Sequence, residues 1–317
     1  MMAFAAGAAG AVGKVPTRAE YLPVPTHAPS FAAFDAWLSQ ATDTALARTG
    51  ATWPPAFACG AMHGFFYHWA ADEPDAALCG AIAPSRDSAG RQFPLALALP
   101  LRVSAVLAAR PELLPLNLEE VWASATAGLA ELLDVGDPAK VTPGFGPSLA
   151  ADVQESDELY REWTSTLPLE ELWVLLGMGA RDPAATLRLL FATVSPLRGR
   201  ERPATTLSLR VPLGAAGGPA VCAWLDFLRR SLGWRSTLPS FFWSHDGKDG
   251  AALLHLGSPP KITLAELWLP TGAQDEIADL TAPVSPALME ALAPLPAPIS
   301  GVLATPRATL ADLLAAL

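Results

Sequence analysis

The segment from residue 84 to 91, PSRDSAGR, gathers the side chains of this chain that are best suited to chemistry: two hydroxyls, one carboxylate and two guanidiniums beside a glycine. Arginine pairs bidentately with carboxylate and phosphate groups, so this composition predicts a site for an anion or an acidic peptide. The same residues also fit a tight turn, in which Asp87 accepts backbone N–H bonds and Arg91 holds it by an ion pair. The residue types leave both interpretations open.

Ser85 is the candidate nucleophile of this segment. A serine nucleophile needs a histidine base and an acid that orients it, but the chain has no GxSxG motif and no histidine close to Ser85 in sequence. A hydrolase or phosphate-handling enzyme that uses Ser85, Asp87 and Arg91 therefore requires a distant histidine to approach Ser85 in the fold. The candidates are His63, His68, His245 and His255. We keep this enzyme as an alternative and expect that the chain is not an enzyme.

Metal and cofactor chemistry find little support in the sequence. The three cysteines, an odd number without a CxxC pair, do not build a disulfide framework and indicate reduced thiols in a cytoplasmic protein. Cys59 and His63 lie four residues apart and His68 follows five residues later, but core residues are a simpler interpretation than metal ligands. We expect no bound metal and no cofactor.

The charge of the chain bears on its partners. With a formal net charge of −10 and a pI of about 4.9, it lacks the basic surface that nucleic-acid binding requires, and an anionic membrane would repel it. The apolar start, MMAFAAGAAGAV, has no basic segment before it and falls short of the ~20 apolar residues of a membrane-spanning helix. We interpret it as a frayed start or part of a first strand, and expect a cytoplasmic protein without membrane insertion.

Hydrophobic spacing predicts the elements that position these residues. Apolar residues recur at helical spacing from Ser30, the expected N-cap, to about Arg48. Asn117 is expected to cap a helix that ends near Asp134, and the prolines at 93–103 mark that segment as an edge strand. The other predicted strands are 64–70 and 77–83, which form a hairpin, and 205–213, 238–244 and 251–257; the other helices are 155–165, 168–177, 182–195, 219–232 and 262–269, with two short helices beyond residue 270.

The two halves of the chain carry similar patterns. FFYHWAADEPDAALCGAIAPS in the first half and SFFWSHDGKDGAALLHLGSPP in the second share a Phe-Phe pair, a Trp, an acidic turn and an Ala-Ala-Leu run. A helix precedes each hairpin, with Trp37 in one and Trp224 in the other, so we interpret these tryptophans as equivalent. PLALALPL follows the first hairpin, whereas the similar TLSLRVPL comes before the second helix. This repeat predicts two related units with one strand placed differently in the chain.

These elements predict an α+β protein: two related units of mainly antiparallel sheet flanked by helices, with the helices on one face of the meandering strands. The order of elements suggests a longin-like or roadblock-like sheet. A Pro/Gly-rich segment at 136–147 separates a first unit, residues 1–140, from a second unit, residues 148–270. A Pro-rich segment with short helices follows at 271–317.

Four segments of the chain resemble the TagF (ImpM-like) accessory proteins of bacterial type VI secretion systems, and their order and approximate spacing along the chain agree with that family. GKVPTRAEY at 13–21 is similar to the family's GKLPSRGDF pattern, and PSRDSAGRQFPL at 84–95 is similar to its PSxDxxGRxFPL motif. FDAWL at 34–38 looks like the family's tryptophan helix, and SFFW at 240–243 looks like its later S-[LF]-[FW]-W segment. The resemblance covers roughly residues 10–270.

The resemblance implies a role without catalysis. TagF proteins restrain type VI secretion after translation, are linked to its threonine-phosphorylation pathway, and are thought to engage the forkhead-associated scaffold protein of the system. The resemblance therefore implies that this chain is a non-enzymatic regulator that binds and sequesters such a component. A structural baseplate-associated protein is a further alternative. Ala19, Glu20 and Ser88 depart from the Gly, Asp and basic residue that are usual in the family. The predicted interaction residues lie in two loops: Lys14, Arg18, Glu20, Ser85, Asp87, Gly90 and Arg91.

Overall fold

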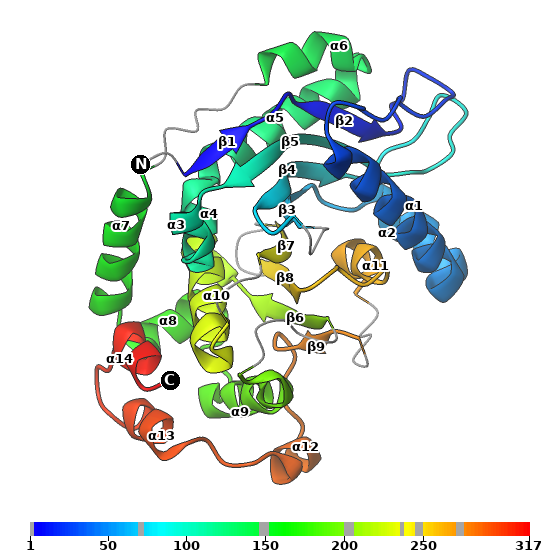
Figure 1. The fold of residues 1–317 in the computed structure, drawn as a ribbon. Coiled ribbons are helices and arrows are strands. Elements are labelled where there is room, and N and C mark those ends of the chain that lie inside the picture. Colours follow the sequence, from blue (N-terminus) through cyan, green and yellow to red (C-terminus); the bar gives the residue numbers. More distant parts are fainter. Residues whose placement is uncertain are drawn as a thin grey trace.

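A computed structural model describes residues 3–68, 73–145, 152–199, 206–234, 238–244, 250–270 and 276–317 (Figure 1). Trp69, His245, the first residue of the predicted turn at 72–75 and most of the predicted turn at 246–250 lie outside these ranges. The strands are β1 Phe4–Ala6, β2 Gly10–Gly13, β3 His63–Tyr67, β4 Ala76–Ala83, β5 Leu95–Val103, β6 Leu207–Pro212, β7 Pro239–Ser244, β8 Ala251–Leu256 and β9 Ala278–Asp279. The helices are α1 Pro29–Thr49, α2 Trp53–Ala58, α3 Ala105–Ala108, α4 Leu114–Asn117, α5 Glu119–Val135, α6 Pro138–Val141, α7 Val153–Thr166, α8 Leu169–Leu175, α9 Pro183–Val194, α10 Gly218–Leu232, α11 Thr263–Trp268, α12 Pro286–Ala291, α13 Ala297–Leu303 and α14 Leu310–Ala315.

The described strands form one mixed sheet that is mostly antiparallel. Its order is β1-β5-β4-β3-β7-β8-β6-β9, with β2 also paired to β5, and the parallel neighbours are β6 and β9. The two predicted hairpins meet where β3 pairs with β7, in a register that places Phe65 opposite Phe242 and Phe66 opposite Phe241. The fold is therefore α+β, as predicted, and both halves of the chain share a single sheet.

The predicted repeat matches the topology of this sheet. On either side of the β3–β7 junction the order is β3-β4-β5 and β7-β8-β6, so β6 occupies the place in the second half that β5 occupies in the first. In sequence β6 precedes the β7–β8 hairpin, whereas β5 follows the β3–β4 hairpin, yet the two strands take equivalent positions in the sheet. The apolar start of the chain also lies in strands, since β1 and β2 both pair with β5.

The prediction that residues 93–103 form an edge strand is wrong, because β5 pairs with β4 on one side and with β1 and β2 on the other. Pro100 is tolerated since it lies where the chain passes from β1 to β2. Its carbonyl accepts a bond from the Gly7 N–H at 2.8 Å on that side, and its missing N–H would face the same way. The proline therefore removes no hydrogen bond between β5 and β4.

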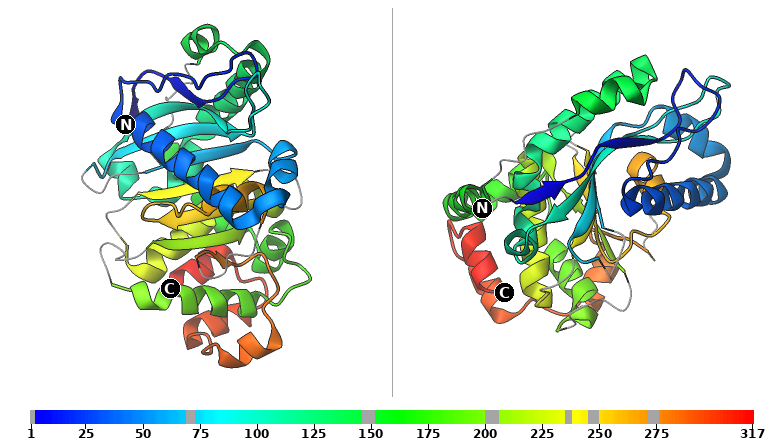
Figure 2. Two further views of the ribbon diagram at one scale, coloured as in Figure 1. Left: turned by 90° about the vertical axis from the view of Figure 1, so that its right-hand side faces the viewer. Right: turned by 45° about the horizontal axis from the view of Figure 1, so that its top comes forward.

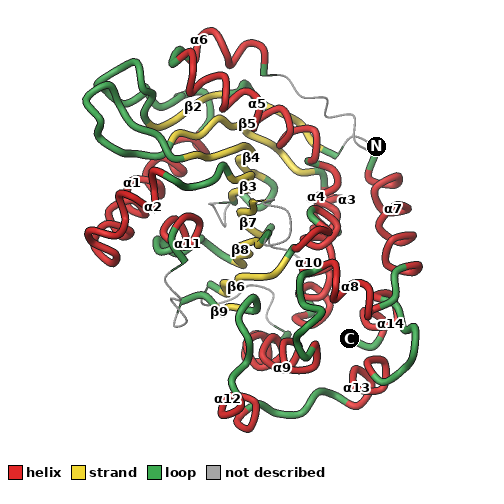
Figure 3. Tube along the Cα trace, turned by 180° about the vertical axis from the view of Figure 1, so that it is seen from behind, coloured by secondary structure: helices red, strands yellow, loops and turns green. Residues whose placement is uncertain are grey.

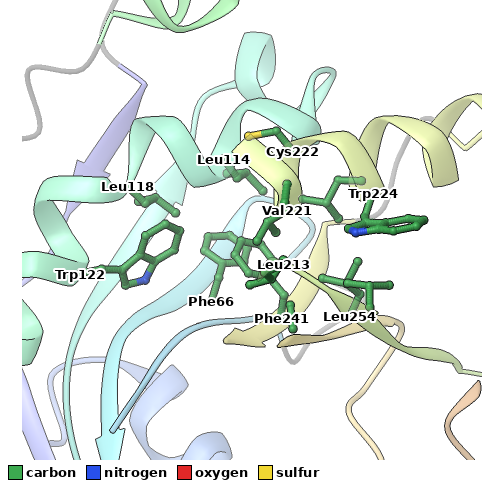
Figure 4. Close-up of a cluster of buried hydrophobic side chains, with 14 of the residues drawn as sticks. Phe66, Leu114, Leu118, Trp122, Leu213, Val221, Cys222, Trp224, Phe241 and Leu254 are labelled. Atoms are coloured by element: carbon green, nitrogen blue, oxygen red, sulfur yellow. The ribbon is translucent and has the colours of Figure 1, made fainter. Parts of the chain in front are cut away.

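Helices cover both faces of the sheet, not one face as predicted (Figure 2, right). Because side chains alternate across a strand, neighbouring phenylalanines of the junction enter different cores. Phe66 and Phe241 point into the larger core, under α4, α5 and α10 (Figure 4). Phe65 and Phe242 point into the second core, under α1, α2 and α11.

The predicted equivalence of Trp37 and Trp224 is wrong. Trp37 lies on α1 in one core and Trp224 lies on α10 in the other, so the sheet separates them. Since β6 takes the position of β5, the helix that follows it, α10, corresponds to α5, which follows β5. Trp122 on α5 lies in the same core as Trp224. The helix α10 thus keeps its place after β6, although β6 precedes its hairpin in the chain whereas its counterpart β5 follows its own. The order of elements in the sequence does not reveal this correspondence.

Two predicted helix caps are also wrong. Helix α1 begins at Pro29 after an extended Ala28, and proline suits this first position because its missing N–H has no partner in a helix. Ser30 is therefore inside the helix, buried, with no hydrogen-bond partner for its hydroxyl among the described residues. Asn117 ends α4 and donates to the Leu113 carbonyl at 2.9 Å, while α5 begins at Glu119.

The C-terminal segment wraps around the second half of the molecule (Figure 3). From residue 276 on, where the structure describes it, this segment contains three short helices, whereas two were predicted. Leu169 N–H donates to the Ala308 carbonyl at 2.8 Å, and the Arg188 guanidinium donates to the carbonyl of Ala293 at 2.9 Å. Across the described ranges, no helix is both long enough and apolar enough to cross a bilayer.

Candidate interaction site

Two loops that are distant in sequence meet at one end of the sheet: the loop after β2 and the loop between β4 and β5 (Figure 1). Gly13 ends β2 with a φ of 113°, a conformation that favours glycine. A Cβ at this position would lie 2.0 Å from the Pro94 carbonyl oxygen. The glycine therefore permits the close approach that brings the segments GKVPTRAEY and PSRDSAGRQFPL together. We call residues 13–22 and 84–93 the motif surface.

Asp87 is the centre of this arrangement and is buried. Its Oδ2 accepts bonds from Lys14 Nζ at 2.9 Å and Arg91 Nε at 2.7 Å. Its Oδ1 accepts the backbone N–H groups of Ala89 at 3.0 Å and Arg91 at 2.8 Å. Burial alone would raise the pKa of Asp87, but the hydrogen bonds from Lys14 and Arg91 outweigh it and hold this pKa well below its usual value. Asp87 is thus a fixed carboxylate with four donors.

Further bonds join the two loops directly. Ser85 is buried, and its hydroxyl donates to the Lys14 carbonyl at 2.8 Å. The Arg91 guanidinium donates to the Ala19 carbonyl at 2.5 Å, and the Ser88 N–H donates to the Arg18 carbonyl at 2.9 Å. The tight-turn interpretation therefore describes the geometry within residues 84–91. The same residues also hold the preceding loop, 73 positions away at Lys14, which sequence reasoning did not foresee.

The seven predicted residues divide into a buried and an exposed group. Lys14, Ser85 and Asp87 are buried and form the connection between the loops. The exposed residues are Arg18, Glu20, Gly90 and Arg91, whose side chain is 62% exposed. Arg18 also forms an exposed ion pair with Asp137 at 3.4 Å, which links the first loop to the start of α6. Whether the exposed group binds a partner stays a prediction.

Sequence reasoning missed Tyr21 as a member of this surface. Tyr21 is 52% exposed, and its ring meets the Phe93 ring edge-on with 4.9 Å between the ring centroids. Lys14 Nζ lies over the Tyr21 ring, 4.6 Å from its centroid. These contacts fix an exposed aromatic ring on the motif surface by packing and by a cation–π interaction. The available signal was its place at the end of the GKVPTRAEY pattern, where the resembling family has Phe.

The arrangement that the enzyme alternative requires is not formed among the described residues. The Ser85 hydroxyl is engaged with a carbonyl, and the three described candidate histidines have hydrogen-bond partners elsewhere. Nδ1 of His63 lies 3.0 Å from the Ala61 carbonyl, that of His68 lies 2.8 Å from the Ala76 carbonyl, and that of His255 lies 2.9 Å from the Ser208 hydroxyl. His245 lies outside the described ranges. In the same ranges no group of three or more His, Cys, Asp or Glu side chains is placed to hold a metal.

Both motif loops lie in a part of the chain that resembles a known protein family. Residues 10–141 match the family described as the TagF N-terminal domain, type VI secretion system-associated. This part of the chain is therefore similar to the TagF N-terminal domain. The chain is also similar to PA0076 of Pseudomonas aeruginosa PAO1, known from a crystal structure, with 15% identity and a TM-score of 0.41 over 83% of this chain and 95% of that one. Likeness at this level carries no functional information. No curated protein matches the chain.

Proposed function

We propose that this protein is a cytoplasmic, non-enzymatic regulator that restrains a type VI secretion system by binding and sequestering one of its components, such as the forkhead-associated scaffold protein. The family of its N-terminal domain associates the chain with this system. The motif surface is the part of the molecule that we assign to the partner.

The observation that carries this proposal is the buried network around Asp87. It engages the Ser85 hydroxyl, the Lys14 amine and the Asp87 carboxylate with one another and with the backbone. These groups are thus occupied in shaping the two loops, which favours a binding role over catalysis. Preformed loops also lose little conformational freedom on association, so more of the contact energy becomes affinity.

A direct binding measurement tests the proposal. The purified full-length chain is titrated with the purified forkhead-associated scaffold protein of the same system and, separately, with its baseplate components. The surface is probed by Tyr21→Ala, since exposed aromatic anchors carry much of the energy of protein interfaces. Leu159→Ala is the matched control, because Leu159 is 56% exposed on α7 and far from the motif surface in sequence.

We expect binding to the scaffold protein, at least about 10-fold weaker for Tyr21→Ala and unchanged for Leu159→Ala. Binding to baseplate components alone would replace the regulator with the structural, baseplate-associated alternative. If the folded wild type binds neither class of component, the proposed function is wrong. The enzyme that uses Ser85, Asp87 and Arg91 would then be the next hypothesis to assay.

A further inference from the structure

A pocket of about 410 Å³ opens beside the motif surface. It is bounded by both motif loops, by α2 and by the C-terminal end of α5. Pro16, Ala58 and Leu133 supply accessible apolar side chains, while Arg86 and Gln92 supply polar ones. Its volume falls in the range of about 300–1,000 Å³ that is usual for binding pockets. The remaining lining residues are Phe57, which is only 1% exposed, Pro84, Ser85 and Gly90.

Arg86 differs from the other arginine of the same turn. Arg91 is held by Asp87 and by the Ala19 carbonyl, whereas the exposed Arg86 side chain has no hydrogen-bond or ion-pair partner among the described residues. Its backbone is nevertheless fixed, because Arg86 and Gln92 form an antiparallel bridge. The Gln92 side chain in turn donates to the Pro54 carbonyl at 3.0 Å, which ties this turn to α2. A positioned backbone therefore presents an available guanidinium at the pocket.

The charge of this region is opposite to that of the whole chain. The motif surface contains four basic residues, Lys14, Arg18, Arg86 and Arg91, against the acidic Glu20 and Asp87. It thus carries a net positive charge within a chain whose formal net charge is −10. A complementary partner must present negative charge here, and opposite potentials favour association and suppress other partners.

We propose that this pocket receives an acidic segment of the protein partner, with an Asp or Glu carboxylate on the Arg86 guanidinium and a neighbouring apolar side chain against Pro16, Ala58 and Leu133. This inference rests on the proposed function, because the segment belongs to the secretion component that the motif surface binds. A guanidinium beside an apolar wall recognises two properties at once: a planar carboxylate by its paired N–H groups and an aliphatic or aromatic side chain by burial.

The test compares two matched charge removals, Arg86→Asn and Arg307→Asn, in titrations with the purified forkhead-associated scaffold protein. Arg307 is a suitable control because it is also exposed and without an ion-pair partner in the described ranges, and lies in the C-terminal segment. Its φ of 59° is one that asparagine tolerates. We expect Arg86→Asn to weaken binding at least 10-fold and to flatten the salt dependence of the affinity, while Arg307→Asn leaves both unchanged.

Each other outcome is informative. If Arg86→Asn and Arg307→Asn bind within twofold of each other and Tyr21→Ala still binds weakly, the motif surface binds the partner without the pocket, and this inference alone is wrong. If the wild type does not bind, the proposed function is wrong. If phosphatase treatment of the partner abolishes binding, the occupant bears a phosphate and the carboxylate assignment is overturned. Circular dichroism of each variant verifies that its fold is intact.

Discussion

Replacing Phe242 by alanine tests whether the two halves of the sheet form one cooperative structure. Phe242 is fully buried on β7, opposite Phe65 of β3. Its ring centroid lies 5.4 Å from that of Trp37 and 6.0 Å from that of Phe65, so the ring contacts two elements of the first half. Truncating a buried phenylalanine costs about 3–5 kcal/mol through lost burial and the cavity left behind. We expect about 4 kcal/mol here, because aromatic rings surround the site and cannot collapse into the space.

This free energy converts into a shift of the melting temperature. Unfolding entropy of about 2.1 cal/mol/K per residue gives about 0.67 kcal/mol/K for 317 residues that unfold together. A loss of about 4 kcal/mol therefore lowers Tm by about 6 °C. The assay is thermal and urea unfolding, followed by far-ultraviolet circular dichroism and tryptophan fluorescence. Val174→Ala, at a side chain that is 66% exposed, is the control and should stay within about 0.5 kcal/mol of the wild type.

Two results would refute this reasoning. A cost below about 1 kcal/mol for Phe242→Ala would mean that the junction is not packed as described. Two separate transitions in the wild type, with different midpoints for the two probes, would mean that the halves unfold independently although β3 pairs with β7.

Three further predictions concern single residues. Gly90 has a φ of 81° and space for a Cβ, so backbone strain alone should act on a substitution there. In urea unfolding, Gly90→Ala should destabilise the protein by about 1 kcal/mol and Gly90→Asn by less. Equal stability of the wild type and both variants would contradict this. Burial lowers the pKa of His255 to about 3. Because the unfolded chain takes up this proton near pH 6.5, His255 should make the free energy of unfolding fall by up to about 1.4 kcal/mol per pH unit from there toward pH 3. The slope of His255→Gln should be smaller by this amount; equal slopes of the two proteins would contradict the burial of a neutral His255. Of the three cysteines, Cys59 is exposed while Cys79 and Cys222 are buried with raised pKa values, so a thiol reagent should label one thiol in the native chain and three in urea; more than one fast-reacting native thiol would contradict this burial.

The elements that local patterns define could be predicted from the sequence. The strand expected at 77–83 is found at Ala76–Ala83, and the helix expected at 182–195 is found at Pro183–Val194. Alternation and helical spacing depend on neighbours within a few residues, so they remain visible without the fold. The pairing of β3 with β7 could not be predicted, because it joins Gly64 to Trp243 and no local pattern encodes the partner of a strand.

The candidate site was predictable in composition but not in arrangement. Lys14 and Asp87 each stand in a noticeable motif, yet only the fold shows that they form a buried pair. Glu112 was missed altogether. It follows a proline in what looks like a surface loop, but it is fully buried and forms ion pairs with Arg110 at 2.5 Å and Arg229 at 2.9 Å. The packing of α10 against residues 111–113 creates this environment, and a sequence read segment by segment does not reveal it.

The β3–β7 junction has a consequence for the order in which the protein is made. The chain must grow by 177 residues after Tyr67 before β7 is complete at Ser244, which takes roughly 9–35 s at about 5–20 residues/s on the ribosome. Throughout this interval β3 is an edge strand without β7, because Phe242 and Phe241, the partners of Phe65 and Phe66, have not yet been made. Open edge strands are prone to aggregation. In a fragment that ends at residue 141, β3 has no β7 to pair with at any time. The segment that matches the TagF N-terminal domain, residues 10–141, therefore lacks a strand that its own sheet pairs with, so the unit of homology is smaller than the sheet.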